Sequence, residues 1–351
     1  MPIVTVLVNT FNHQLFIAKA LSSIVEQDFP AADTEIIVVD DGSTDLTPEI
    51  VRQFLPRIKF FRKQNGGQVS AVLEGLAHAT GEIIAFLDGD DWWAPNKLSK
   101  VIDAFDRHPQ IAAVGHGYYE VNEQGTSIRT MTTGSECRLS CETAELARNA
   151  ANLRVFGGTS RMALRRKAID QLLPVPLILP YADNFIFSHA IALSGAALLP
   201  DLLCYYRLHS KNIYASESFD EQRFRRRLEH LEYLSEYLPP RLKTLGVSND
   251  AISAFLEFDR IDAKRLRLIL DGGTPLGTFR AELSAFRSEY RNPDIGYTFF
   301  KMLVLFVTLI TPPKTFYRLR QWYTQKGLMR FRQRIGRGTP TVPEVKARPI
   351  I

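Results

Sequence analysis

Three carboxylates lie almost side by side in this 351-residue chain, at Asp88, Asp90 and Asp91, directly after the apolar run at residues 83–87. At the end of a buried strand such groups repel one another and lose their hydration, so a cation is expected among them. Oxygen ligands of this kind suit Mg²⁺ or Mn²⁺, which bind through one or two carboxylates and substrate phosphates. The alternative is an acidic turn that caps a helix starting near Pro95.

Strands and helices alternate in the part of the chain that must position these carboxylates. Residues 3–8 and 35–39 are apolar runs typical of strands buried on both faces, and residues 15–25 between them have helical spacing. This alternation predicts an α/β fold with a parallel, doubly wound sheet. Ligands of such sheets bind beyond the carboxyl ends of the strands, where each polar cluster of this region is expected.

Further motifs stand in a fixed order around the acidic segment. Residues 8–12 end in Phe-Asn, residues 38–47 read Val-Val-Asp-Asp-Gly-Ser-Thr-Asp-Leu-Thr, residues 65–68 read Asn-Gly-Gly-Gln, and residues 81–91 read Gly-Glu-Ile-Ile-Ala-Phe-Leu-Asp-Gly-Asp-Asp. In order, spacing and residue type the chain resembles the inverting family 2 glycosyltransferases. The resemblance implies a GT-A fold, with a mixed, mainly parallel sheet flanked by helices, a nucleotide-sugar donor, and Mg²⁺ or Mn²⁺.

The resemblance also assigns roles residue by residue. The donor-binding residues that it implies are Thr10, Asn12, Asp40, Asn65, Gly67, Asp88 and Arg207. Among these, Asp40 is expected to accept an N–H from uracil or guanine. The predicted metal ligands are Asp90 and His209, and the acceptor-side residues are Asp91, Gly158 and Thr159. Asp91 orients either the acceptor or Asp90.

Asp183 is the predicted catalytic base. It lies in Tyr-Ala-Asp-Asn-Phe at residues 181–185, where the family usually has Glu-Asp ahead of a helix. Ala182 replaces that Glu, which leaves Asp183 as the carboxylate for the role. The structural alternative, compatible with a base, is an N-cap of a helix over residues 185–193. One base and one metal-assisted leaving group imply a single displacement with inversion at the anomeric carbon.

Composition indicates how large a core the protein can form and in which cellular compartment it is expected. With 45% hydrophobic and 23% charged residues, the chain can bury one sizeable core and an appendage. Three cysteines are too few for a disulfide framework, and Met1 and Pro2 lead into the first strand without a cleavable signal. We therefore expect a cytoplasmic protein.

The predicted organisation has three regions. Residues 1–215 form the catalytic domain, with a nucleotide-sugar half at 1–115 and an acceptor half at 116–215; residues 216–290 are an accessory helical region. Residues 291–351 form a tail with twelve Lys or Arg against Asp294 and Glu344, while the whole chain carries +5. Its apolar run at 299–310 is too short to span a bilayer core of ~30 Å.

The tail admits two interpretations. An amphipathic helix followed by cations suits peripheral contact with the anionic inner face of the cell membrane. The alternative is a core helix with a solvated basic end. Nucleic acid is not an expected partner, since no recognition fold accompanies the cations.

The sequence thus predicts a metal-dependent enzyme that moves a sugar from a nucleotide-diphosphate sugar to a hydroxyl of a glycan or lipid-linked acceptor, in cell-surface polysaccharide biosynthesis. The alternative is a non-catalytic nucleotide-sugar sensor or scaffold, which the replacement at Ala182 favours. A nucleotidyltransferase would need a Gly-rich, cationic phosphate loop after the first strand, and residues 9–14 have none.

Overall fold

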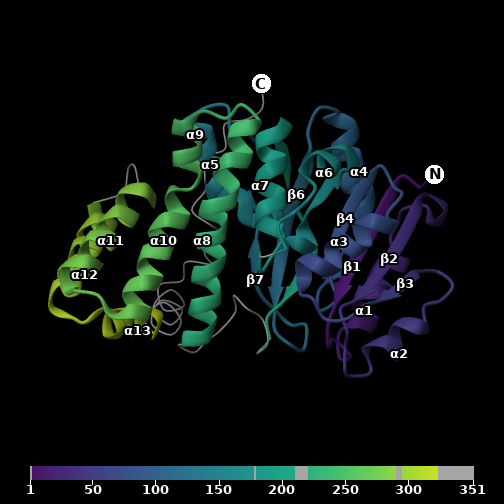
Figure 1. Ribbon diagram of the computed structural model, residues 1–351, viewed down its shortest axis with the longest axis horizontal. Helices are drawn as coiled ribbons and strands as arrows, with labels where there is room; N and C mark the ends of the chain where they lie inside the picture. Colours follow the sequence, from purple (N-terminus) through teal and green to yellow (C-terminus); the bar gives the residue numbers. More distant parts are fainter. Residues whose placement is uncertain (1, 178, 210–219, 290–294, 323–351) are drawn as a thin grey trace.

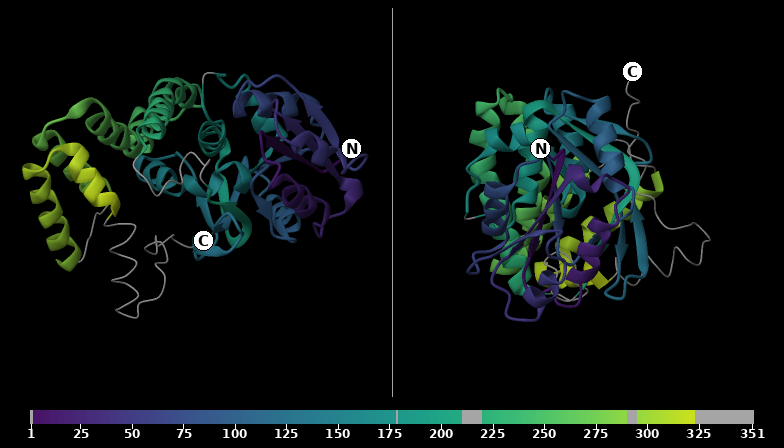
Figure 2. Two further views of the ribbon diagram at one scale, coloured as in Figure 1. Left: turned by 90° about the horizontal axis from the view of Figure 1, so that it is seen from below. Right: turned by 90° about the vertical axis from the view of Figure 1, so that its right-hand side faces the viewer.

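The computed structural model describes residues 2–177, 179–209, 220–289 and 295–322 (Figure 1). An α/β unit contains the N-terminus, and a group of helices extends from its opposite side (Figures 1 and 2). The predicted α/β class with a C-terminal helical extension is confirmed.

Ten described strands form one sheet in the order β3-β2-β1-β4-β9-β6-β10-β5, with β7 on β6 and β8 on β10. Their bounds are β1 Val4–Thr10, β2 Thr34–Asp40, β3 Lys59–Arg62, β4 Ile83–Asp88, β5 Trp92–Trp93, β6 Ala113–Val121, β7 Ser127–Met131, β8 Cys137–Leu139, β9 Ala163–Arg165 and β10 Ala196–Arg207. β3, β2, β1 and β4 run parallel, as do β6 and β10, whereas β9 is antiparallel to both of its neighbours. The sheet is therefore mixed and mainly parallel, as predicted.

Helices flank this sheet and then continue beyond it. In the α/β unit they are α1 Ile17–Val25, α2 Thr47–Arg52, α3 Gln68–His78, α4 Lys97–Arg107, α5 Ala144–Leu153, α6 Arg166–Leu172 and α7 Asp183–Ser194. The extension contains α8 Glu221–Thr244, α9 Asn249–Phe255, α10 Glu257–Arg267, α11 Pro275–Glu289, α12 Ile295–Ile310 and α13 Pro313–Trp322. None of the helices in the described ranges is long and apolar enough to cross a bilayer.

The register of the parallel strands places the polar clusters at one edge. All seven residues of β1 are buried, as its continuous apolar pattern predicts. Thr10 of β1 pairs with Asp40 of β2, and Asn9 pairs with Asp88 of β4. Because these strands end together, the loops that follow them meet at the same edge.

In its described residues the structure contains neither of the two helix caps that were the alternatives to a metal site and a base. The acidic segment does not cap the next helix, because β5 intervenes and α4 begins at Lys97 after Asn96. Asp183 is the first residue of α7 and not its N-cap; the cap position is Ala182, without a side-chain cap bond. Asp183 Oδ1 instead accepts the N–H of the adjacent Asn184 at 2.7 Å.

The hydrophobic core extends from the sheet into the helical extension. Leu234, Leu238 and Leu242 of α8 belong to the same buried cluster as the strands of the sheet. A second, smaller cluster joins α8 and α10 to the C-terminal helices through Leu231, Ala263, Leu266, Ile269, Phe316 and Tyr317. The extension is thus packed on the α/β unit and also has a core of its own.

Candidate active site

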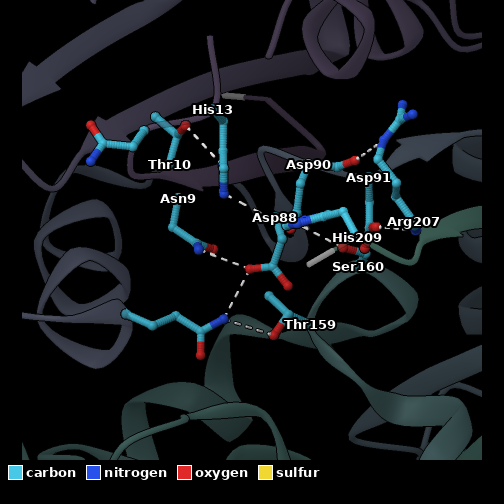
Figure 3. Close-up of polar contacts among 12 residues, drawn as sticks. Asn9, Thr10, His13, Asp88, Asp90, Asp91, Thr159, Ser160, Arg207 and His209 are labelled. Carbon is cyan, nitrogen blue, oxygen red and sulfur yellow. Dashed lines mark hydrogen bonds and ion pairs between the residues drawn. The ribbon is translucent and has the colours of Figure 1, made fainter. Parts of the chain in front are cut away.

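Asp88 lies at the centre of a hydrogen-bonded group that joins both halves of the α/β unit (Figure 3). Its Oδ1 accepts from Asn9 Nδ2 at 2.8 Å and from Gln68 Nε2 at 2.9 Å. Gln68 Nε2 also lies 3.3 Å from Thr159 Oγ1, and Ser160 Oγ accepts the backbone N–H of Asp88 at 3.1 Å. Residues from β1, from the start of α3 and from the segment after Gly158 therefore meet at the carboxyl end of β4.

Two amide oxygens beside Asp88 are left without a partner. Asn9 Oδ1 and Gln68 Oε1 are buried and have no hydrogen-bond donor among the described residues. Unpaired buried acceptors are costly, so a ligand that donates hydrogen bonds is expected there. Ribose hydroxyls have this chemistry.

Asp90 is the carboxylate that faces the two histidines. Its Oδ2 lies 2.9 Å from His209 Nε2 and 3.8 Å from His13 Nε2. Burial alone would raise the pKa of Asp90, but the neighbouring His13 and the hydrogen bond from His209 outweigh it and lower the pKa. The sequence interpretation included His209 and missed His13, although His13 directly follows Asn12.

Burial and mutual repulsion raise the pKa values of the other two carboxylates. Burial, followed by the charge of Asp90, raises the pKa of Asp88 to about 7. Burial and the charges of Asp90 and Asp88 likewise raise the pKa of Asp91. A cation among the three would relieve both effects.

Asp91 is turned into the protein. It is 2% exposed, and its Oδ1 accepts the backbone N–H of Arg207 at 2.8 Å, while Arg207 Nε donates to the carbonyl of Asp90 at 2.9 Å. These bonds fix the end of β10, and with it His209, against the acidic loop. Of the two roles expected for Asp91, this placement favours the orientation of Asp90 over contact with an acceptor.

Gly89 explains why the loop can approach β1 so closely. An ideal Cβ at this position would lie 2.7 Å from Thr10 Oγ1 and 2.9 Å from His13 Nδ1. A larger residue there would force Thr10, His13 or the loop itself to shift.

The remaining donor-side residues form a second group beside β2. Asp41 holds the loop of Asn65 and Gly67 by accepting the N–H of Gly66 at 3.0 Å and of Gly67 at 2.7 Å. Asn12 Oδ1 accepts the N–H of Thr44 at 2.8 Å and so joins the loops after β1 and β2.

Asp40 lies buried beneath this second group. Its Oδ1 accepts the N–H of Ser43 at 3.0 Å. Its Oδ2 has no hydrogen-bond donor among the described residues, although Arg62 Nε lies 3.1 Å away without hydrogen-bond geometry. That oxygen can accept from a base N–H.

Asp183 lies at the N-terminal end of α7, half-buried. Burial and the charge of Asp90 raise the pKa of Asp88, and the charge of Asp183 raises it further. Asp183 is therefore close enough to the acidic cluster to interact with it electrostatically. A Cβ at Gly158 would collide with the guanidinium of Arg161, so a larger residue there would have to displace that side chain.

The structure thus gathers most of the expected site residues and adds others. Around the acidic loop it brings together Thr10, Asp88, Asp90, Asp91, Thr159, Arg207 and His209 (Figure 3). Asn9, Gln68 and Ser160 join them and were not expected as site residues, although all three fall in or beside the sequence motifs.

A divalent metal fits this donor set only in combination with a substrate. Within the described residues, no three His, Cys, Asp or Glu side chains are grouped closely enough to hold a metal ion by themselves. Asp90 and His209 offer one carboxylate and one imidazole, which suits a metal that completes its coordination with diphosphate oxygens.

Two cysteines lie apart from this site, in the core. Burial raises the pKa of the thiols of Cys137 and Cys141, so they are expected to be unreactive.

Comparison with known proteins gives the family. Residues 5–173 match the family described as glycosyl transferase family 2. A glycosyltransferase of Nostoc sp. is 30% identical over 219 residues, which are 61% of this chain and 67% of that protein. A protein of Mycobacterium tuberculosis is 30% identical over 223 residues, 61% of each chain, so less than two thirds of that relative is matched.

Two solved structures show the same fold. TarS of S. aureus, in complex with UDP-GlcNAc, has a TM-score of 0.52 and 19% identity, covering 82% of this chain and 89% of that one. The mannosyltransferase PcManGT of Pyrobaculum calidifontis, in complex with GDP-Man and Mn²⁺, has a TM-score of 0.51 and 22% identity, covering 88% and 85%. With this fold and the sequence match, the chain belongs to glycosyltransferase family 2.

Proposed function

We propose that the protein is an inverting, metal-dependent glycosyltransferase that uses a nucleotide-diphosphate sugar. The observation that carries the proposal is the group at the carboxyl end of β4, where repelling carboxylates, two unpartnered amide oxygens and His209 surround Asp88 and Asp90. Such a group suits a ribose, a diphosphate and Mg²⁺ or Mn²⁺. The ligands named for the TarS and PcManGT structures, UDP-GlcNAc and GDP-Man with Mn²⁺, support this class of donor.

The proposed roles follow the positions of the side chains. We propose that the nucleoside is bound by Asp40, Asn12, Asn65 and Gly67, and the ribose by Asp88. Asp90 and His209 would hold the metal, which when bound neutralises charge on the leaving diphosphate. Arg207, whose Nε donates to the carbonyl of Asp90, would assist through its guanidinium.

Asp183 would remove the proton from the acceptor hydroxyl as that oxygen attacks the anomeric carbon. Gly158 and Thr159 would line the acceptor side. A single displacement inverts the configuration, so an α-linked donor would give a β-linked product.

We further infer that the acceptor is a glycan or a lipid-linked glycan in cell-surface polysaccharide synthesis, and that the enzyme works at the cytoplasmic face of the membrane. The exposed face of α12 supports this location. Within residues 302–310, six side chains are 38–70% exposed, and all six are apolar: Met302, Leu303, Phe306, Val307, Leu309 and Ile310. Seven Lys or Arg against one Glu follow in residues 323–351 of the sequence, which lie outside the described residues.

A non-catalytic nucleotide-sugar sensor is the second candidate. Ala182, which stands where the family usually has Glu, is buried in the core at the start of α7. A carboxylate is therefore absent at that position, and a sensor would bind donor and metal as an enzyme does but would not turn the donor over.

A thermal-shift panel of nucleoside diphosphates with and without Mn²⁺ tests the proposal. We expect Mn²⁺ alone to shift the melting temperature little and Mn²⁺ with UDP or GDP to shift it strongly, since a ligand at one hundred times its Kd adds ~2.7 kcal/mol. Asp90→Asn should abolish the joint shift and the release of sugar from donor, with the fold intact. Asp103→Asn, an exposed carboxylate of α4, is the matched control.

Two outcomes would contradict these assignments. An Asp90→Asn variant with unchanged turnover would remove Asp90 from the mechanism. Nucleotide binding without any hydrolysis or transfer of donor sugars would favour the sensor.

A further inference from the structure

We propose that His230, contributed by α8 of the helical extension, is a positioning residue that holds the turn bearing Asp183 in its reactive place. The inference rests on the proposed function, because it takes Asp183 as the base. The helical extension would then help to position the catalytic base, in addition to the membrane contact proposed for α12.

His230 contacts residues on both sides of Asp183. Its Nε2 lies 3.3 Å from Asn184 Nδ2, and its ring meets the ring of Tyr181 edge to face with centroids 5.2 Å apart. His230 is 1% exposed, so these contacts are shielded from water. The turn is therefore held from α8 at the residue after the base and two residues before it.

The turn lacks the support that helix starts usually have. The first N–H groups of a helix need partners, and an N-cap side chain commonly supplies one. Ala182 has no such side chain, and Asp183 reaches only the N–H of Asn184. The contact from α8 to the Asn184 side chain therefore restrains a helix start that has no side-chain cap of its own.

The ring is suited to act as a neutral brace. Burial lowers the pKa of His230, and the charge of Asp183 raises it. Arg154 and Arg227 lower this pKa further, whereas Asp259 raises it. With Asn184 Nδ2 as donor, Nε2 accepts and the proton lies on Nδ1. Nδ1 has no partner among the described residues, so the contact with Asn184 is the polar contact that fixes the ring.

α8 itself is held firmly against the α/β unit. One turn on either side of His230, Arg227 pairs with Asp262 of α10 at 2.6 Å and Leu234 is buried in the main core. α10 in turn is joined to the α/β unit by ion pairs between Arg154 and Asp259 and, at 3.0 Å, between Arg148 and Glu257. The position of His230 is thus set by the whole extension.

The test compares two buried histidines at the α7–α8 interface. His189 of α7 is also fully buried, and its Nδ1 accepts from Arg241 Nε of α8 at 3.4 Å. Its Nε2 has no hydrogen-bond partner among the described residues, so its ring makes no hydrogen bond to Tyr181 or Asn184. We expect His230→Ala to lower kcat for transfer about 10- to 100-fold, because a misplacement of ~1 Å can cost ~10²-fold. The KM for donor and the Mn²⁺-nucleotide thermal shift should stay within about threefold, because the donor side is untouched.

Rescue and control variants separate positioning from folding. His230→Asn retains a polar group and should recover most of kcat, whereas His189→Ala should lower the melting temperature and leave kcat within about threefold. Asn184→Ala, which removes the partner from the other side, should reproduce the loss of kcat even if His230→Ala fails to fold. Loss of kcat in His189→Ala as large as in His230→Ala, or full kcat in Asn184→Ala, would overturn the inference.

Asp183→Asn distinguishes this inference from the proposed function. If that variant keeps full transfer, the assignment of the base fails and the inference fails with it. If Asp183→Asn abolishes transfer while His230→Ala and Asn184→Ala keep kcat, the proposed function stands and only the role of His230 is wrong.

Discussion

Lys97 is a buried cation directly beneath the acidic loop. Its Nζ donates to the carbonyl of Ser160 at 2.8 Å and lies 3.6 Å from the ring centroid of Trp93, whose Nε1 donates to the same carbonyl at 3.0 Å. Ser160 in turn accepts the N–H of Asp88. Burial lowers the pKa of Lys97 to about 7. One side chain therefore holds the acceptor half against the carboxylates at a cost in desolvation.

This cost predicts a pH dependence of stability. The pKa of Lys97 is lower in the folded state than its ordinary 10.5, so between pH 7 and 10.5 the unfolded chain binds a proton that the folded chain does not. The contribution of Lys97 to the free energy of unfolding should therefore rise with pH, by up to ~1.4 kcal/mol per pH unit, and be constant below pH 7. Denaturant unfolding of wild type and Lys97→Met from pH 6 to 9.5 measures the difference. A difference that does not change with pH would show that the lysine titrates normally.

The acidic loop and the end of β10 act as one unit at the scale of elements. Asp91 fixes the backbone of Arg207, and two residues later His209 meets Asp90. The loop between β4 and β5 thus holds the end of β10 in place. The arrangement couples the packing of β10 to the proposed metal site.

Asp91→Ala tests this coupling. The variant leaves the N–H of Arg207 buried without an acceptor, so we expect a loss of ~1–3 kcal/mol in the free energy of unfolding. Mn²⁺-dependent nucleotide binding should weaken because His209 is no longer held beside Asp90. Asp91→Asn keeps an acceptor oxygen and removes a repelling charge, so its stability should stay near that of wild type. Full nucleotide affinity in Asp91→Ala would show that the loop does not position the site.

The C-terminal helices have two different faces at the scale of the whole molecule. Leu305 and Thr308 of α12 are buried, and Phe316 and Tyr317 of α13 complete the smaller core. The opposite face of α12 is exposed and apolar. One face of α12 and helix α13 therefore pack as core elements, while membrane contact of the exposed face stays a proposal; removal of α12 and α13 would uncover that core.

Point substitutions on the exposed face test membrane contact without opening the core. We expect the protein to bind vesicles with anionic lipid, less so at 1 M salt where the Debye length is ~3 Å. The double variant Phe306→Glu/Ile310→Glu should lose this binding at an unchanged melting temperature. Leu146→Glu, at an exposed position of α5, should keep it. Equal binding to neutral vesicles, or none to anionic ones, would contradict the proposal. Dimerisation lost in the double variant would assign the face to a second copy.

The division of the chain at residues 215 and 290 stays a proposal. The main core crosses the first boundary through α8, and buried Glu282 of α11 contacts Arg265 of α10 at 2.7 Å and Tyr317 of α13 at 2.9 Å. The helical extension therefore depends on contacts across both boundaries.

By itself the sequence determined the strands, the family and the edge of the sheet where ligands bind. Residues buried on both faces leave continuous apolar runs, and the polar clusters directly follow those runs. β1, β2 and β4 and the positions of Asp40 and Asp88 could therefore be predicted, because each depends on neighbours in the chain.

Only the tertiary structure decided which distant residues complete the site. β9 inserts antiparallel between β4 and β6 and so brings Thr159 and Ser160 to Asp88. The contacts of His13 with Asp90 and of His230 with Asn184 likewise join elements far apart in the chain. The spacing of residues along the sequence does not predict such contacts, because strand order and helix packing depend on how the whole core is buried.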